Sequence, residues 1–398
     1  MKVSPQQDLT FEVVIERIVP RGYGLAHAEG FTVFVALAAP GDRLRVRAVE
    51  IKGKIAFAEI EEILDAGPER VPGPCPYFTV CGGCDFQQMT YAEQLSSKIA
   101  IIRDCLRRIG RIEDDIPIGI VGSPKEFGYR SRAQWHVNPN TREIGYYKRN
   151  SRDLVAIDHC PKLVPELNAA LARLRDEMPW EQVWSEKAFF DVAVGDEGQV
   201  SMNSPGLCDP KEISYSVAGE TFRYSAGVFF QGNQFLIPQL LETALSGAEG
   251  RNALDLYCGA GLFALPMARR FEKVLGVEEH PGAVEFAKNN AKANGMSNVD
   301  FRTESVRHFL SGFDPGNIDF ILLDPPRAGT EKETIHNLIR IGAPHISYVA
   351  CEPSVLARDL KRFVEAGYRI DSITAIDLFP QTHHVETVAH LKSPDTVN

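Results

Sequence analysis

The chain has 398 residues, 44% hydrophobic and 24% charged, a composition typical of a globular protein of two or three domains with a sizeable core. A formal net charge of -10 argues against a protein that coats nucleic acid through bulk electrostatics. No stretch approaches the roughly 18 apolar residues of a membrane span, and the first residues lack the apolar run of a secretory signal. We therefore expect a cytoplasmic protein without a membrane partner.

The first 66 residues are predicted to form a small β domain. Apolar and polar residues alternate in short runs from about Thr10 to Leu64, with turn signals at 21–24 and 40–42. This pattern predicts a small antiparallel barrel or sandwich. Glycines and prolines at 67–68 and 72–74 then mark a boundary, so we assign residues 1–66 to this domain.

Four cysteines mark the second predicted domain, residues 67–222. Cys75, Cys81 and Cys84 form a C-x5-C-x2-C pattern in glycine- and proline-bearing loop sequence, and Cys160 is a candidate fourth ligand. Four thiolates suit either a zinc ion or an iron–sulfur cluster, and ligand identity alone does not decide between them. Unrelated reduced thiols are the alternative.

A basic segment follows in the same domain. Seven basic and two acidic residues lie between Lys125 and Arg152, so the local balance is +5. The aromatic residues interleaved with them are Tyr129, Trp135, Tyr146 and Tyr147. Aromatic rings among arginines suit stacking on unpaired bases together with phosphate contacts. The segment therefore predicts nucleic-acid binding, and a strand face with its own core aromatics is the alternative.

Residues 223–398 have the pattern of an α/β domain. Four apolar runs, at 253–257, 273–278, 319–324 and 346–351, are separated by helical patterns and predict βα units of a mainly parallel sheet. Two last strands, Tyr368 to Asp377 and Thr387 to Lys392, have no helix between them. We therefore predict a doubly wound sheet that closes with an antiparallel hairpin.

A cofactor site is predicted where the first of these strands ends. Gly259 and Gly261 form a G-x-G-x-x-A turn between strand and helix, a pattern that alone also fits a dinucleotide. Glu278 ends the next strand, where a carboxylate can accept hydrogen bonds from the ribose hydroxyls of an adenosine-containing cofactor. The acidic Asp255, and Asp324 with its diproline followed by a cysteine, favour S-adenosylmethionine, which carries a sulfonium and an amine and no pyrophosphate.

Cys351 is the candidate nucleophile. Cys351 follows one predicted buried strand, and Asp324 follows another. Open α/β sheets bind their ligands at the carboxyl ends of the strands, so we expect the two residues to share one site. A thiol there can attack an electron-poor ring, and Glu386 in the next loop can act as the base. A buried structural cysteine is the alternative.

Taken together, these motifs resemble those of the RNA 5-methyluridine methyltransferases over nearly the whole chain. The resemblance implies a Rossmann-like class I methyltransferase domain, preceded by a TRAM-type, OB-like barrel and a central α+β iron–sulfur domain. It also implies a 4Fe–4S cluster on the four cysteines, with zinc less favoured. Segments 127–132 and 145–148 are similar to the family's RNA-facing segments, and 229–233 resembles its FFQ-x-N motif. The implied methyl-donor residues are Gln231, Asp255, Tyr257, Gly259, Gly261, Glu278, Glu304 and Asp324, and the implied RNA-binding residues are Arg130, Arg132, Lys148 and Arg149.

Three residues depart from the family pattern. Tyr257 replaces the usual phenylalanine, Leu262 a frequent asparagine, and Glu352 the common asparagine after the nucleophile. Leu262 cannot donate a side-chain hydrogen bond to the cofactor. Glu352 brings a negative charge beside Cys351, which disfavours the thiolate. Neither departure removes the catalytic pair.

The resemblance implies methyl transfer from S-adenosylmethionine to C5 of an unpaired or flipped uridine, with 23S ribosomal RNA as the expected target. The implied reaction proceeds through a covalent bond from Cys351 to C6, with Glu386 as base. We expect a monomer. The alternatives are an RNA 5-methylcytosine methyltransferase, which commonly has a second cysteine where this chain has Arg327, a transfer-RNA uridine-C5 methyltransferase, an amino-group methyltransferase, and a non-catalytic RNA-binding or ribosome-assembly factor.

Overall fold

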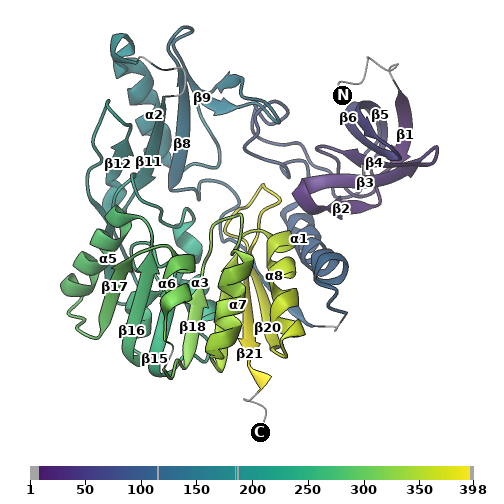
Figure 1. Ribbon diagram of the computed structural model, residues 1–398. Coiled ribbons are helices and arrows are strands. Elements are labelled where there is room, and N and C mark those ends of the chain that lie inside the picture. The colour runs from purple at the N-terminus through teal and green to yellow at the C-terminus, as the bar shows by residue number, and fades with distance from the viewer. Residues whose placement is uncertain (1–8, 114–115, 184, 186–187, 315, 395–398) are drawn as a thin grey trace.

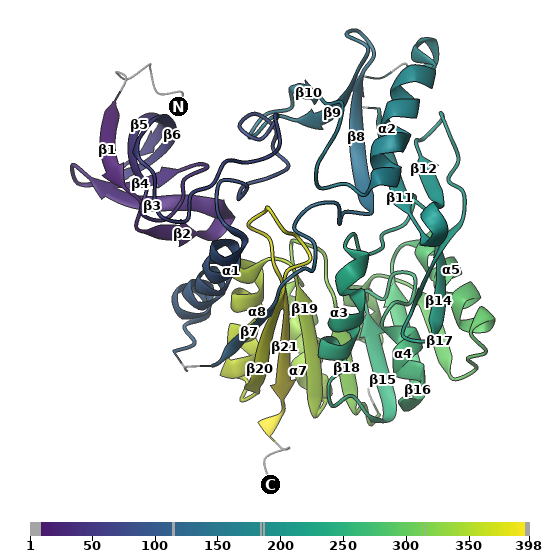
Figure 2. The same ribbon diagram turned by 180° about the vertical axis from the view of Figure 1, so that it is seen from behind.

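The computed structural model describes residues 9–394 apart from 114–115, 184, 186–187 and 315. An N-terminal β domain stands beside a large α/β sheet, and a second, smaller sheet lies above that sheet's opposite end (Figures 1 and 2). Within the described ranges, no helix has both the length and the apolar character that a membrane crossing requires.

The N-terminal domain is one six-stranded sheet with its own core. Its strands are β1 (Thr10–Val14), β2 (Arg17–Val19), β3 (Tyr23–Ala28), β4 (Phe31–Val35), β5 (Arg43–Lys52) and β6 (Ile55–Asp65), in the order β1-β5-β6-β4-β3-β2. Adjacent strands are antiparallel except β4 and β6, which run parallel. Alternate residues such as Val33, Val35, Leu44 and Val46 are fully buried, so the period-two pattern of the sequence places one face of each strand in the core.

The central sheet has the order β10-β9-β8-β11-β12 and is covered by helix α2 (Pro165–Glu177). Its strands are β8 (Arg132–Asn138), β9 (Glu143–Tyr147), β10 (Leu154–Ala156), β11 (Phe189–Val194) and β12 (Val200–Asn203). Short helical turns lie at η3 (Trp180–Gln182) and η4 (Asp196–Gly198). A separate hairpin, β13 (Ile213–Val217) with β14 (Glu220–Tyr224), leads into the last part of the chain.

The large sheet has eight strands in the order β17-β16-β15-β18-β19-β21-β20-β7. Its strands are β7 (Ile118–Val121), β15 (Gly250–Leu256), β16 (Phe271–Glu278), β17 (Val299–Thr303), β18 (Phe320–Leu323), β19 (His345–Ala350), β20 (Arg369–Ile376) and β21 (Glu386–Lys392). The five strands from β17 to β19 are parallel, and β21 pairs antiparallel with both β19 and β20. The predicted α/β sheet with an antiparallel close is therefore confirmed.

Helices cover both faces of this sheet. The helices are α3 (Ile237–Ala244), α4 (Ala264–Ala268), α5 (Pro281–Ala293), α6 (Val306–Gly312), α7 (Lys332–Ile341) and α8 (Pro353–Glu365), with the turn η5 (Gln234–Leu236) before α3. Helices α3, α4 and α5 belong to one core, and α6, α7 and α8 belong to another. Because both faces are covered, strands such as β18 are buried at every position, which explains their unbroken apolar runs.

Strand β7 adds to the edge of the large sheet, and helix α1 (Tyr91–Cys105) packs against that part of the fold. Both elements lie within the range 67–222 that the sequence assigned to the central domain. Strand β7 pairs parallel with β20 at the sheet edge, and residues of α1 share a core with α8. Thr90 caps α1, since its side chain accepts a hydrogen bond from the backbone of Glu93 at 3.4 Å. The α-helix passes at its end into a π-helical turn, η2 (Leu106–Gly110).

Candidate active site

Four predicted site residues meet at one edge of the large sheet. Strand β15 is followed directly by Tyr257, β18 by Asp324 and β19 by Cys351. Glu278 is the last residue of β16. These strands are parallel neighbours, so their carboxyl ends lie along the same edge (Figure 2). Open α/β sheets bind their ligands at this edge.

The pairing of β19 with β21 places Cys351 across from Glu386. Ala350 is the partner of Thr387 in this antiparallel pair. Continuing the register by one residue brings Cys351, which follows Ala350, opposite Glu386, which precedes Thr387. The candidate nucleophile and base, which are 35 positions apart in the sequence, are therefore neighbours in the fold.

Buried charges dominate the electrostatics of this pair. Burial, and next the nearby Glu386, raise the pKa of Cys351 to about 12, while Arg327 acts in the opposite direction. Burial and the neighbouring Asp324 raise the pKa of Glu386 well above its usual range. Among the described residues, Glu386 Oε1 has no hydrogen-bond partner. Burial also raises the pKa of Asp324 to about 7.

The turn after β15 needs glycine at two positions because its backbone has positive φ angles there. Gly259 and Gly261 have φ angles of +52° and +91°, and a Cβ on Gly261 would lie 2.7 Å from Leu265 Cδ1. Tyr257 also has a positive φ, 65°, which is uncommon for a residue with a side chain. Leu262 is 7% exposed and belongs to the hydrophobic core, so its side chain packs inside the domain.

Glu278 is held in place by two backbone donors. The N–H of Gly259 donates to Glu278 Oε2 at 3.2 Å, and the N–H of His280 donates to Oε1 at 2.8 Å. The backbone of Glu304 donates to the carbonyl oxygen of Glu278 at 3.0 Å. Asp255 is fully buried, and burial, followed by the charge of Asp324, raises its pKa well above the usual range. This edge is therefore acidic.

Gln231 lies in the segment between β14 and α3. Its side chain is 4% exposed, whereas the neighbouring Phe229 is 68% exposed. Phe230 stacks on Tyr224, with ring centroids 4.2 Å apart, and fixes this segment against the hairpin.

All four predicted cysteine ligands line one cavity of about 740 Å³, together with Arg327 and Glu352, which lie near the carboxyl ends of β18 and β19. The cysteine loop is braced by Gln87, whose Nε2 donates to Cys84 Sγ at 3.0 Å and whose Oε1 accepts from the Cys75 N–H at 3.2 Å. Buried Lys162 places a positive charge among the thiols and lowers the pKa of Cys160 against the larger opposing effect of burial.

The four predicted RNA-binding residues lie in different environments. Arg130, Lys148 and Arg149 line the cavity, whereas Arg132 donates to the carbonyl oxygen of Ala226 at 3.2 Å. Burial lowers the pKa of Arg132. Arg149 donates to Asp85 at 2.7 Å and to the carbonyl oxygen of Cys84, so it also supports the cysteine loop.

Two of the aromatic rings expected to stack on bases are core residues. Trp135 and Tyr129 are 0% and 1% exposed, so the stacking prediction is wrong for both. Side chains of successive strand residues point to opposite faces of the sheet, and in β8 every second residue, Trp135 among them, is buried. Tyr147 is partly exposed and stacks on His136, with ring centroids 3.9 Å apart.

The loop between β20 and β21, which leads to Glu386, is fixed by contacts that the sequence did not indicate. Lys98 donates to Asp377 Oδ1 at 2.5 Å, and both side chains are fully buried. Gln94 and Gln381 exchange two hydrogen bonds, each of 3.0 Å. Gln94 and Lys98 are one turn apart on α1 and therefore lie on the same face of the helix. Two polar residues at this spacing on an otherwise apolar face were the sequence signal that could have indicated a buried polar contact.

A second anchor of the same loop comes from the cysteine segment. Asp85, the residue after Cys84, accepts a hydrogen bond from His383 Nδ1 at 2.6 Å. The backbone N–H groups of Asp85 and Phe86 both donate to the carbonyl oxygen of Gln381. The cysteine loop and the loop carrying the candidate base are thus directly connected.

Comparison with known proteins gives consistent results. Residues 211–393 match the family model described as tRNA (Uracil-5-)-methyltransferase. An uncharacterized RNA methyltransferase of Thermosynechococcus vestitus is 31% identical, covering 97% of this chain and 98% of that protein. A 23S rRNA (uracil(1939)-C(5))-methyltransferase of Pectobacterium atrosepticum is 32% identical, covering 98% and 94%.

Among solved structures, the Pyrococcus abyssi tRNA (uracil-54, C5)-methyltransferase in complex with S-adenosyl-L-homocysteine has a TM-score of 0.74. It is 27% identical and covers 95% of this chain and 100% of that one. The similarity therefore extends over all three parts of the fold.

Proposed function

Because this chain belongs to the family of RNA uracil-C5 methyltransferases, we propose that it methylates C5 of an unpaired uridine in 23S ribosomal RNA through a covalent bond between Cys351 and C6. The observation that supports this proposal is the register of β19 and β21, which pairs Ala350 with Thr387, the residues next to Cys351 and Glu386. A nucleophile and a base on rigid neighbouring strands suit addition to a pyrimidine followed by proton removal.

The chemistry requires activation of the base. C5 of uracil is a poor nucleophile, and attack of the Cys351 thiolate on C6 turns the ring into an enolate across C5, C4 and O4. S-adenosylmethionine, when bound, supplies the methyl group as an electrophile for C5. Glu386 then takes the proton from C5, the C5–C6 double bond re-forms, and the bond from C6 to the Cys351 sulfur breaks. The thiolate leaves with the electron pair of that bond.

Arg327 is the residue of this chain that favours both ionised forms. It opposes the burial that raises the pKa values of Cys351 and Glu386. Both residues must lose a proton before they react, so a guanidinium near them lowers the cost of forming the thiolate and the carboxylate. Arg327 also lines the cavity through which we propose that the uridine enters.

We assign the methyl donor to the acidic edge and glycine turn described above. Glu278 retains lone pairs on both carboxylate oxygens for ribose hydroxyls while two backbone N–H groups fix its orientation. Asp255 and Asp324 are carboxyls with raised pKa values, and a bound sulfonium and amine would favour their ionised forms. The remaining proposed contacts are Gln231, Tyr257, Gly259, Gly261 and Glu304. The bound S-adenosyl-L-homocysteine of the Pyrococcus abyssi enzyme supports this assignment.

We assign a 4Fe–4S cluster to Cys75, Cys81, Cys84 and Cys160. A single tetrahedral zinc ion with bonds of about 2.3 Å would hold its thiolates roughly 3.8 Å apart. In the described part of the chain, no three of these sulfur atoms lie within 4.8 Å of one another. The four thiols line one cavity with Lys162 among them, and the resemblance to the family favours a cluster over one ion. Anaerobic purification should give brown protein containing iron and sulfide, and stoichiometric zinc in its place would contradict the assignment.

The ribosomal target is supported by the relative from Pectobacterium atrosepticum, which aligns over nearly the whole of both chains. Transfer RNA is the second candidate, because the Pyrococcus abyssi enzyme shares the complete architecture. Mapping 5-methyluridine in 23S and transfer RNA from a strain that lacks the gene tests both. Loss of one 5-methyluridine from 23S RNA supports the proposal, and loss from transfer RNA alone contradicts it.

A further inference from the structure

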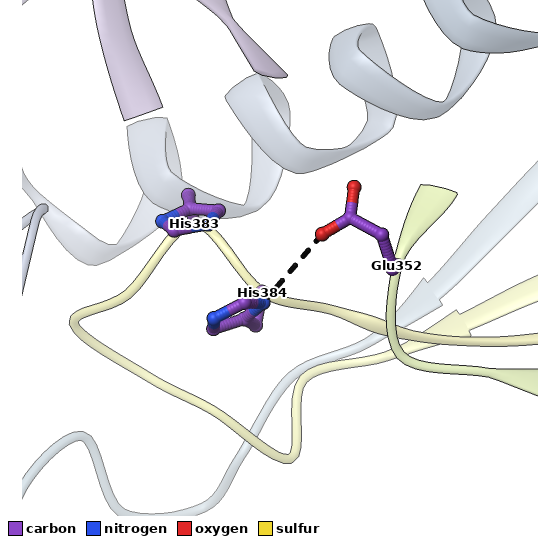
Figure 3. Close-up of side chains that lie close together, drawn as sticks. All are labelled: Glu352, His383 and His384. Atoms are coloured by element: carbon purple, nitrogen blue, oxygen red, sulfur yellow. Dashed lines mark ion pairs between the residues drawn. The ribbon is translucent and has the colours of Figure 1, made fainter. Parts of the chain in front are cut away.

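Three candidate metal ligands converge beside the catalytic edge. Glu352 precedes helix α8, and His383 and His384 lie in the loop between β20 and β21 (Figure 3). Each has one candidate ligand atom within 4.8 Å of those of the other two. All three residues line the cavity of about 740 Å³, so an ion has a route to them from solvent.

His384 lacks a partner that its burial requires. Within the described ranges its Nδ1 is buried and makes no hydrogen bond, and Glu352 Oε2 lies 3.9 Å away. That separation is too long for a hydrogen bond, and a buried polar atom without a partner destabilises the folded state. Zinc bonds of about 2.0–2.2 Å at the tetrahedral angle hold two such ligand atoms roughly 3.4 Å apart. An ion bound by both atoms therefore needs a closing movement of about 0.5 Å.

The other two side chains are held by hydrogen bonds that each leave one possible ligand atom free. His383 Nδ1 is 2.6 Å from Asp85 Oδ2, and Arg149 donates to the other oxygen of Asp85 at 2.7 Å. A carboxylate on one imidazole nitrogen is the usual support of a metal-binding histidine, and it leaves Nε2 as the ligating atom. Ser354 donates to Glu352 Oε1 at 2.8 Å, which leaves Oε2 for the ion.

We propose that Glu352, His383 and His384 bind one divalent transition-metal ion of the zinc class, with its open coordination position toward the cavity. Two imidazoles and one carboxylate suit zinc or iron(II), whereas magnesium and calcium prefer oxygen ligands alone. The site is separate from the four cysteines and is independent of the RNA target. A cation here offsets the charge of Glu352 next to the candidate nucleophile and offers a position to an RNA oxygen.

Zinc binding to the intact, cluster-loaded protein tests the proposal. Anaerobically purified protein is dialysed against buffered Zn²⁺, and zinc and iron per chain are measured by mass spectrometry. We expect one zinc per chain in the wild type and its loss in His384→Ala and in Glu352→Gln, with unchanged iron. His308→Ala is the matched control, because His308 pairs with Glu304 at 3.4 Å on the exposed surface.

X-ray absorption at the zinc edge of the wild-type protein gives a readout that does not depend on any variant folding. Nitrogen and oxygen neighbours at about 2.0–2.2 Å support the site. Sulfur neighbours at about 2.3 Å would assign the ion to the cysteines and overturn the proposal. Equal zinc content in the wild type and both ligand variants would overturn it as well.

Discussion

The catalytic edge and the cysteine-bearing loops differ in what fixes their geometry. At the edge, each site residue lies at or next to the end of a strand, and the order and register of the strands determine which residues are neighbours. The proposed cysteine ligands lie on loops that make contacts with distant segments, such as Asp85 with His383. The first arrangement is carried by the backbone, whereas the second depends on individual side chains.

Replacing the nucleophile gives the strongest test of the catalytic edge. Cys351→Ala should abolish methylation and leave binding of S-adenosylhomocysteine unchanged, because the strands that carry the donor site are untouched. Methyl transfer to 23S RNA and calorimetric binding measure the two properties. Cys208→Ala, which removes a partly buried thiol outside the edge, is the control. Methylation by Cys351→Ala at the wild-type rate would remove Cys351 from its assigned role.

Replacing the base tests the step after methyl transfer. Glu386→Gln should slow turnover on the order of 10²–10⁴-fold, since proton removal from C5 loses its acceptor. The methylated RNA should then remain attached to Cys351 and appear as a shifted band in a denaturing gel. Glu365→Gln on the exposed side of α8 is the control. Normal turnover without any adduct would refute the base assignment.

The sequence predicted the parallel strands and their carboxyl ends but not the loop contacts, for a physical reason. Apolar runs that end in Asp324 or Cys351 announce parallel strands, and parallel strands bring their ends together regardless of the loops. Contacts such as Lys98 with Asp377 join residues 279 positions apart, and neither residue carries a local signal of its partner. The same holds for β7, a short strand whose Ile118 pairs with Ile373 of β20, far along the chain.

The buried pair of Lys98 and Asp377 tests how strongly the loop contacts matter. Lys98→Met leaves Asp377 as a buried charge whose remaining hydrogen bond comes from Tyr91 at 2.9 Å. Removing one partner of a buried ion pair costs about 3–5 kcal/mol of unfolding free energy. Because Asp377 begins the loop that ends at Glu386, kcat should fall more than KM rises. Urea unfolding and steady-state kinetics measure both effects.

Two companion variants separate this effect from the loss of a lysine. Lys98→Met combined with Asp377→Asn removes the stranded charge and should recover part of the stability. Lys361→Met breaks a 3.9 Å pair with Glu365 on the surface of α8 and should change the unfolding free energy by less than about 1 kcal/mol. Equal losses in Lys98→Met and Lys361→Met would mean that the loop does not depend on its anchor.

The smallest expected effect comes from the acidic edge and depends on pH. The folded state raises the pKa of Asp324 from 3.8 to about 7, so it binds a proton that the unfolded chain has already released. Stability therefore falls as pH rises from about 4 to 7, and the full cost remains above pH 7. Asp324→Asn removes this term. Without methyl donor, the gain of the variant over the wild type should be near zero at pH 4 and on the order of 1–4 kcal/mol at pH 8. Urea unfolding at both pH values measures it, and a gain independent of pH would show that burial of this carboxyl does not favour its protonated form.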